Sequence, residues 1–133
     1  MEADMANMLY KILTPEEWQD ARHALQFDGS AVDLADGFIH FSTARQAAET
    51  ARRHFGGCER IHVLAVEPKL LPKSSLKWEP SRGGDLFPHL YAPLIMATVS
   101  KRWTIDRDPH GGFDFRPIFG PDMGPGGGEN TND

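Results

Sequence analysis

The residues best suited to chemistry gather in two short segments, and the first is centred on His40. Alternate side chains of an extended strand share a face, which places His40 beside Ser42 and turns Ile39 and Phe41 to the other side. Ser42 also directly precedes a predicted helix, whose first N–H groups lack partners within the helix and can bind an anion. An imidazole, a hydroxyl and helix N–H groups together favour a ribose or phosphate ligand. The alternative is a polar strand face in solvent, with Ser42 acting only as a helix cap.

The second segment runs from Glu79 to Tyr91 and is rich in glycine and proline. We interpret it as a loop in which reactive side chains lie beside aromatic anchors, as in many functional loops. The acid, base and polar candidates are Glu79, Ser81, Arg82, Asp85 and His89, and the aromatic ones are Trp78, Phe87 and Tyr91. The alternative is a surface loop whose aromatic residues close one end of the core.

The remaining histidines and the single cysteine carry weaker signals. His62 lies in an apolar strand, which favours a core or edge histidine, and His54 is interpreted as a solvated residue at a helix end. Cys58 lacks a nucleophile motif and is interpreted as structural. No metal site is predicted, because the sequence has no local zinc-ligand spacing; it also has no phosphate-binding glycine loop and no nucleophile elbow. His40, Glu79 and His89 could still converge in three dimensions.

Local signals predict the elements that must position these side chains. Thr14-Pro15-Glu16-Glu17 has the pattern of a capping box and starts a helix with Trp18, Ala21 and Leu25 on one face. A second helix is expected over 43–55, and Ala35-Asp36-Gly37 is a predicted turn. Strands are expected at 9–13, 38–42, 61–66, 76–79, 94–99 and 101–105. Two early helices followed by later strands indicate an α+β fold.

Composition limits the class of protein. The 133 residues suit one domain, and 40% hydrophobic with 25% charged residues is ordinary for a globular protein. The formal charge of −5 argues against coating of nucleic acid through bulk charge. No apolar run is long enough to cross a membrane, and one cysteine suits a reducing, cytoplasmic compartment.

The acidity belongs to the two ends of the chain. Residues 120–133 are rich in glycine and proline, so we expect a disordered tail after a single domain over 8–119. Of the 19 acids, five lie in the ends, which leaves 14 to balance the 14 Lys and Arg residues. The five are Glu2, Asp4, Asp122, Glu129 and Asp133. A small phosphorylated ligand therefore remains compatible with the folded part.

Three separated motifs resemble the bacterial family catalogued as domain of unknown function 952. They are Gly-Phe-Ile-His-Phe-Ser-Thr (37–43), Leu-Lys-Trp-Glu-Pro-Ser-Arg (76–82) and Leu-Phe-Pro-His-Leu-Tyr (86–91). Tyr10-Lys11-Ile12-Leu13, Trp18 and the helix from Gln46 to Phe55 match as well, so the resemblance covers about residues 8–100. It implies an ADP-ribosyltransferase-like fold, with a mixed sheet and two N-terminal helices.

A more distant similarity links the strand around His40 to RNA 2′-phosphotransferases, which use NAD to remove a 2′-phosphate from RNA. His40 and Ser42 would fall on the second histidine and the serine of their motif. Phe38 stands where that motif has its first histidine, and Lys11 is the nearest residue to their basic first strand. Glu79 is a candidate for the acidic catalytic residue of such a fold.

These resemblances imply two alternatives. The first is an enzyme of the ADP-ribosyl-transfer type, or a related hydrolase, that acts on NAD or another nucleotide-like, phosphorylated ligand. His40, His89 and Glu79 would be catalytic, with Ser42, Ser81, Arg82, Trp78 and Tyr91 binding the ligand. The second is a module that binds a small anion or a partner without catalysis, which the missing first-strand Arg or His favours.

Overall fold

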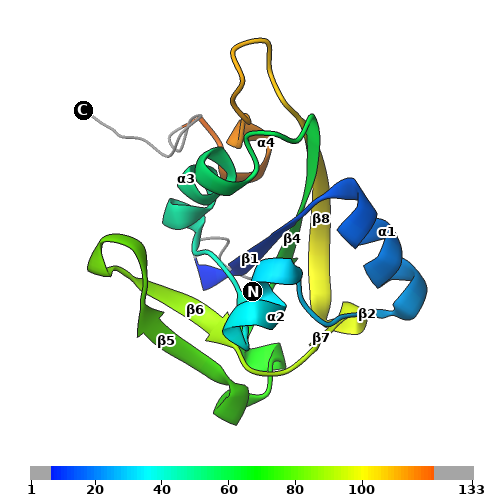
Figure 1. The fold of residues 1–133 in the computed structure, drawn as a ribbon, viewed down its shortest axis with the longest axis vertical. Helices are drawn as coiled ribbons and strands as arrows, with labels where there is room; N and C mark the ends of the chain where they lie inside the picture. The colour runs from blue at the N-terminus through cyan, green and yellow to red at the C-terminus, as the bar shows by residue number, and fades with distance from the viewer. Residues whose placement is uncertain (1–6, 122–133) are drawn as a thin grey trace.

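The computed structural model describes residues 7–121 of the chain. It is one small α+β domain, as predicted, and Figure 1 shows helices packed around a central sheet with a hairpin to one side. The helices are α1 (Pro15–Ala24), α2 (Ala31–Asp36), α3 (Ala44–His54) and α4 (Arg116–Phe119). The strands are β1 (Leu9–Leu13), β2 (Gln26–Phe27), β3 (Ile39–His40), β4 (Arg60–Val66), β5 (Leu76–Pro80), β6 (Leu86–Leu90), β7 (Leu94–Ile95) and β8 (Val99–Asp106). The expected tail lies outside the described residues from position 122 onward.

The strands form three small sheets. Every strand pair within residues 7–121 is antiparallel, so the expected mixed sheet was wrong. β4 lies between β1 and β8, β2 pairs with β7, and β6 lies between β3 and β5. Tyr10 and Ser42 exchange two backbone hydrogen bonds of 2.8 and 2.9 Å. This bridge joins β1 to the chain beyond β3, so the first and third sheets meet just past His40.

The central sheet is covered on both faces. Tyr10 and Ile12 of β1 face one hydrophobic cluster, which contains the alanines of α3 and Phe115. Leu9 and Leu13 face a second cluster, which contains residues of α1, β2, β3 and β6. Alternation along the strand places Lys11 on the same face as Leu9 and Leu13. An ammonium group is therefore held in a largely apolar layer, where it needs a counter-charge.

The predicted helix starts are confirmed. The Glu17 N–H donates to Thr14 Oγ1 (3.1 Å), and the Thr14 N–H donates to Glu17 Oε1 (3.0 Å), which completes the capping box of α1. At the other end, Leu25 adopts a left-handed φ of 64° and is exposed. The expectation that Leu25 packs with Trp18 and Ala21 was therefore wrong, because the cap turns its side chain out of the helix face.

Three other expectations need correction. Residues 31–36 form α2 rather than only a turn, so α1 and α3 are not the only early helices. The segment Glu79–Tyr91 is not a long loop but contains the turn and second strand of the β5–β6 hairpin. The expected strand at 94–99 is divided into β7, a 3-10 turn at Met96–Thr98 and the start of β8. Among the described residues, no helix is long and apolar enough to span a membrane.

Candidate functional site

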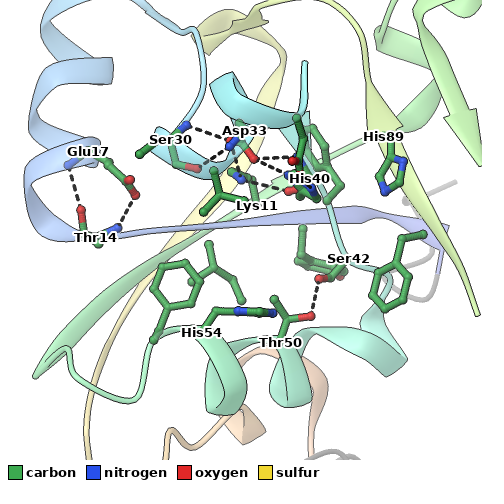
Figure 2. Close-up of a pocket in the computed structure, with 18 of the residues that line it drawn as sticks. Lys11, Thr14, Glu17, Ser30, Asp33, His40, Ser42, Thr50, His54 and His89 are labelled. Carbon is green, nitrogen blue, oxygen red and sulfur yellow. Dashed lines mark hydrogen bonds and ion pairs between the residues drawn. The ribbon is translucent and has the colours of Figure 1, made fainter. Parts of the chain in front are cut away.

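A cavity of about 470 Å³ lies between α2 and β3 on one side and α3 on the other, with β6 at one end. Figure 2 shows Ser30, Asp33 and His40 on one wall, Thr50 and His54 of α3 on the opposite wall, and His89 at the end. Its lining combines aromatic and polar groups. The aromatic residues are Tyr10, Phe41, Phe55 and Phe87, and the polar ones are Lys11, Thr14, Glu17, Ser30, Asp33, Asp36, His40, Ser42, Thr50, His54, Cys58, Ser81 and His89.

Asp33 is the centre of the wall formed by α2. Lys11 Nζ donates to Asp33 Oδ2 (2.9 Å) and to the backbone carbonyl of His40 (3.0 Å). The other oxygen, Oδ1, accepts from the His40 N–H (3.1 Å) and lies 2.6 Å from His40 Nδ1. The Ser30 N–H also donates to Oδ2 (2.9 Å), which makes Asp33 part of the α2 capping box. One carboxylate therefore ties β1, α2 and β3 together.

The surroundings of Asp33 keep it ionised. Burial by itself would raise the pKa of Asp33, but the hydrogen bond with His40 and the charge of Lys11 outweigh it and hold the pKa well below its usual range. Burial also lowers the pKa of Lys11, and Asp33 opposes that change. The pair is thus a buried ion pair in which each partner depends on the other.

His40 is held at both ring nitrogens. Its Nδ1 faces Asp33, and its Nε2 lies 2.9 Å from Oδ2 of Asp36, four residues earlier in the chain. The side chain is 31% exposed. His40 lies directly opposite His89 in the β3–β6 pair, and the two ring centroids are 5.4 Å apart. Two imidazoles from adjacent strands therefore meet at the cavity.

His89 is held at one ring nitrogen only. Its Nδ1 lies 2.7 Å from Glu79 Oε1, which also accepts from the Tyr91 hydroxyl (2.8 Å). These bonds, first that of His89 and then that of Tyr91, hold the pKa of Glu79 below its usual value. The same contact raises the pKa of Tyr91. Glu79 is therefore an ionised acceptor that fixes the orientation of the His89 ring.

The other nitrogen of His89 has no partner. Nε2 is buried, and no hydrogen-bonding group of the described residues reaches it. The His89 side chain is only 4% exposed. The ring of Phe38 stacks on the His89 ring with 4.0 Å between centroids. His89 lines the cavity, so a buried ring nitrogen without a partner among the described residues belongs to its wall.

The candidate residues predicted from the sequence are only partly brought together. His40, Ser42, Ser81 and His89 line the cavity, and the Ser42 hydroxyl donates to Thr50 Oγ1 (3.0 Å). Glu79 is not among the lining residues and contacts Nδ1 of His89. The helix start after Ser42, at Thr43 and Ala44, lies outside the lining.

The aromatic and basic candidates are placed elsewhere. Trp78 lies opposite Pro88, on the hairpin face away from Glu79 and His89, and Tyr91 reaches Glu79 from outside the cavity lining. The Arg82 side chain lies outside the described part of the structure. Trp78 is therefore not positioned as a ligand contact, contrary to our expectation.

Several lining residues were missed by the sequence reasoning. Asp33 and Asp36 escaped it because α2 was interpreted as a turn, yet Ser30-x-x-Asp33 has the capping-box pattern that marked α1 correctly. His54 is exposed, as expected, and it also borders the cavity from α3, which the sequence did not indicate. Within residues 7–121, no three His, Cys, Asp or Glu side chains are grouped so that they could hold a metal ion.

Comparison with solved structures finds a protein of similar sequence and fold. The crystal structure of protein CC0527 from Caulobacter crescentus has a TM-score of 0.78 and 47% sequence identity, and the alignment covers 83% of this chain and 96% of that one. The solution NMR structure of the same protein gives 0.74 and 47%, with coverage of 84% and 95%. No curated protein matches the chain.

A family comparison covers the part of the chain that builds the cavity. The family described as Protein of unknown function (DUF952) matches residues 12–102, which is more than half of the chain. That range includes Asp33, His40, Glu79 and His89, so both histidine–carboxylate pairs lie within it. From this match, and from the resemblance to the Caulobacter protein, the chain belongs to the DUF952 family.

Proposed function

We propose that the chain is an enzyme that acts on a nucleotide-like small molecule, with NAD as the first candidate, and that His89 is its general acid–base. The observation that carries the proposal is the buried, unpartnered Nε2 of His89 at the end of a cavity. Buried polar atoms are almost always hydrogen-bonded, so an exception at a cavity wall suggests a missing ligand group. Imidazole is also the side chain best suited to proton transfer near neutral pH.

The partners of His89 suit this role. A general base works best when a third group orients it, and Glu79 does this for His89 through a 2.7 Å contact. The Tyr91 hydroxyl holds the same carboxylate oxygen from outside. Nε2 would take a proton from a water molecule as that water attacks C1 of the ribose. The nicotinamide would leave with the electron pair of the broken glycosidic bond.

The cavity suits a nucleotide-like body. Its volume of about 470 Å³ lies in the range of small-molecule sites. Phe55 is partly exposed and offers apolar surface for a ring, and hydroxyl and carboxylate groups share the lining with it. The sugar cation that forms during such a transfer would be stabilised by nearby carboxylates. Asp36 is the candidate for this, because His40 already holds one of its oxygens beside the cavity.

A thermal-shift and product assay tests the proposal. We expect NAD at about 100 times its dissociation constant to stabilise the protein by about 2.7 kcal/mol. Nicotinamide release should then fall by about 10²–10⁴-fold in His89→Gln. The matched control is His23→Gln, because His23 is exposed on α1 and contacts only Gln19 among the described partners. If neither NAD nor ADP-ribose nor any mononucleotide stabilises the protein, the proposal is wrong.

The second candidate is a binding module without catalysis. The observation that favours it is the position of Lys11, whose ammonium is fully committed to Asp33 and the His40 carbonyl. Lys11 then contributes structure rather than a ligand contact. Stabilisation by NAD with no nicotinamide release in the wild-type protein would support this function instead.

A further inference from the structure

Positive groups in the cavity wall are already paired with carboxylates of the chain itself. Lys11, the only Lys or Arg among the lining residues that the structure describes, is bound to Asp33. His40 has a carboxylate at each ring nitrogen. The N-terminus of α1 faces the cavity through Thr14, but the Glu17 carboxylate already accepts from the Thr14 N–H there.

The formal charge of the lining is negative. Glu17, Asp33 and Asp36 oppose the single charge of Lys11, and Asp36 is half exposed with one oxygen directed at His40. The expected anion site at the start of α3 does not reach the cavity. An anion placed inside would meet the carboxylates of Glu17 and Asp36, whose charge no Lys or Arg of the described lining offsets, and this is unfavourable.

A second, independent feature points to the same kind of ligand. His89 Nε2 is buried and unpartnered, and Glu79 at Nδ1 makes it a hydrogen-bond acceptor in the neutral ring. An acceptor is satisfied by a donor, such as a hydroxyl or an N–H group. A phosphate at neutral pH offers almost only acceptor oxygens.

From these observations we infer that the buried part of the ligand is a hydrogen-bond donor without negative charge, either the hydroxyls of a sugar or a cationic nitrogen group. This deepens the proposed function and rests on it for the choice of nucleotide probes. Phosphate groups of such a ligand stay outside the cavity, so removing them costs little affinity. The sequence-based expectation of a phosphate held by His40 is replaced by this assignment.

The charge of the cavity can be measured without knowing the ligand. Cys58 is the single cysteine of the chain, and it is partly exposed at the cavity lining. Two rates of Cys58 modification are compared. One is for a methanethiosulfonate reagent that carries a cationic trimethylammonium group, and the other is for a methanethiosulfonate reagent that carries an anionic sulfonate group. The control is Cys58→Ser combined with Ser74→Cys, which moves the thiol to an exposed site outside the lining.

We expect the cation-to-anion rate ratio at Cys58 to exceed that of the control by about tenfold. Asp36→Asn should lower the ratio by about threefold, whereas Asp20→Asn on the exposed side of α1 should leave it unchanged. A ratio at or below that of the control overturns the inference. The ratio of modification rates does not depend on NAD binding, so it tests the inference separately from the proposed function.

A second measurement uses matched ligands. Adenosine should bind within about threefold of adenosine monophosphate, and nicotinamide riboside within about threefold of its mononucleotide, because the phosphate lies outside. Binding of both nucleosides indicates hydroxyl recognition, and binding of the riboside alone indicates recognition of the cation. A tenfold preference for the phosphorylated members contradicts the inference. If no probe binds, the proposed function is wrong. The rates of Cys58 modification then test by themselves whether the cavity disfavours a negatively charged ligand.

Discussion

Two histidine–carboxylate pairs lie side by side at the cavity and are built in opposite ways. His40 and His89 occupy opposed positions on β3 and β6, and both place Nδ1 within 2.7 Å of a carboxylate oxygen. His40 is partly exposed, yet both of its nitrogens are held by acids. His89 is buried, yet one of its nitrogens has no partner among the described residues.

The difference comes from the carboxylates. Asp33 is buried and also bonds Lys11, Ser30 N–H and the His40 backbone, so its histidine is part of a network that joins three elements. Glu79 is partly exposed at the edge of a hairpin and serves only His89 and Tyr91 among its described side-chain partners. At equivalent strand positions, one histidine therefore has both ring nitrogens held by carboxylates, and the other has one nitrogen without a partner among the described residues.

The largest expected effect comes from breaking the network at Asp33. Asp33→Asn leaves the Lys11 ammonium buried without a counter-charge, which should cost about 3–5 kcal/mol in the free energy of unfolding. Urea denaturation followed by circular dichroism measures it. The matched control is Asp106→Asn, which removes an exposed ion pair with Arg60 and should leave the transition nearly unchanged.

A double variant sharpens this prediction. Lys11→Met together with Asp33→Asn removes both charges, and the methionine fills much of the same apolar layer, so we expect more than half of the lost stability to return. If the double variant is as unstable as Asp33→Asn alone, the loss comes from the capping and backbone bonds of Asp33 rather than from the buried, unpaired charge of Lys11.

The second-largest expected effect concerns the His89–Glu79 pair and is a decrease in enzymatic activity. Glu79→Gln keeps an oxygen for Nδ1–H but removes the charge that orients the ring, so we expect nicotinamide release to fall by about 10–100-fold. The decrease should lie in kcat, with KM and the urea midpoint nearly unchanged. Tyr91→Phe, which removes only the outer bond to Glu79, should have a smaller effect. A loss of stability equal to that of Asp33→Asn would make the two pairs equivalent and contradict the comparison.

Acid titration distinguishes the two carboxylates further. The pKa of Asp33 is depressed in the folded state, so the unfolded chain takes up a proton first as the pH falls below the ordinary value of 3.8. The stabilising contribution is present above that pH and decreases below it, by about 2 kcal/mol between pH 4 and pH 2. Other carboxylates with depressed pKa values add to the acid loss in every variant, so we expect the decrease to be smaller by this amount in the Lys11→Met, Asp33→Asn double variant than in the wild type. Glu79→Gln should retain the share of Asp33. Stability curves from pH 2 to pH 5 provide the measurement.

The smallest effect belongs to a third histidine, which has no carboxylate partner. His62 on β4 lies 3.2 Å from both Arg102 and Thr104, and its pKa is lowered first by burial and then by Arg102 and Arg60. Because the folded pKa lies below 6.5, stability is full above pH 6.5 and decreases as the pH falls through and below that value. The decrease should be under about 1 kcal/mol after solvent screening, and absent in His62→Gln. Thermal unfolding from pH 5 to pH 8 measures it, and an unchanged slope in His62→Gln would contradict the assignment.

The sequence predicted the elements whose signals are local. Thr14 and Glu17 mark the start of α1 through bonds between residues three apart, and the same kind of spacing marks α3. The apolar run of β4 and the alternation that turns His40 and Ser42 to one face were also visible. Such signals depend on neighbouring residues, so they need no knowledge of the rest of the fold.

The hairpin of β5 and β6 shows where local signals mislead. The segment Glu79–Tyr91 was interpreted as a loop because it is rich in glycine and proline. Proline cannot donate to a strand ladder, so it is rare in central strands. In the structure Pro88 lies in the middle strand of its sheet, where its carbonyl accepts from the Phe41 N–H (2.9 Å). The third sheet tolerates the missing donor because the pairing of β3 with β6 is only two residues long.

The sequence by itself determined a single α+β domain and its main helix starts, and it named His40 and His89 as candidate site residues. Only the tertiary structure decided which of these histidines keeps a free nitrogen. Asp36, four residues before His40, holds its second nitrogen because α2 lies beside β3. Glu79 reaches His89 across the β5–β6 hairpin, ten residues away. These contacts are set by how α2, the hairpin and the central sheet pack together. No local pattern around either histidine encodes that packing.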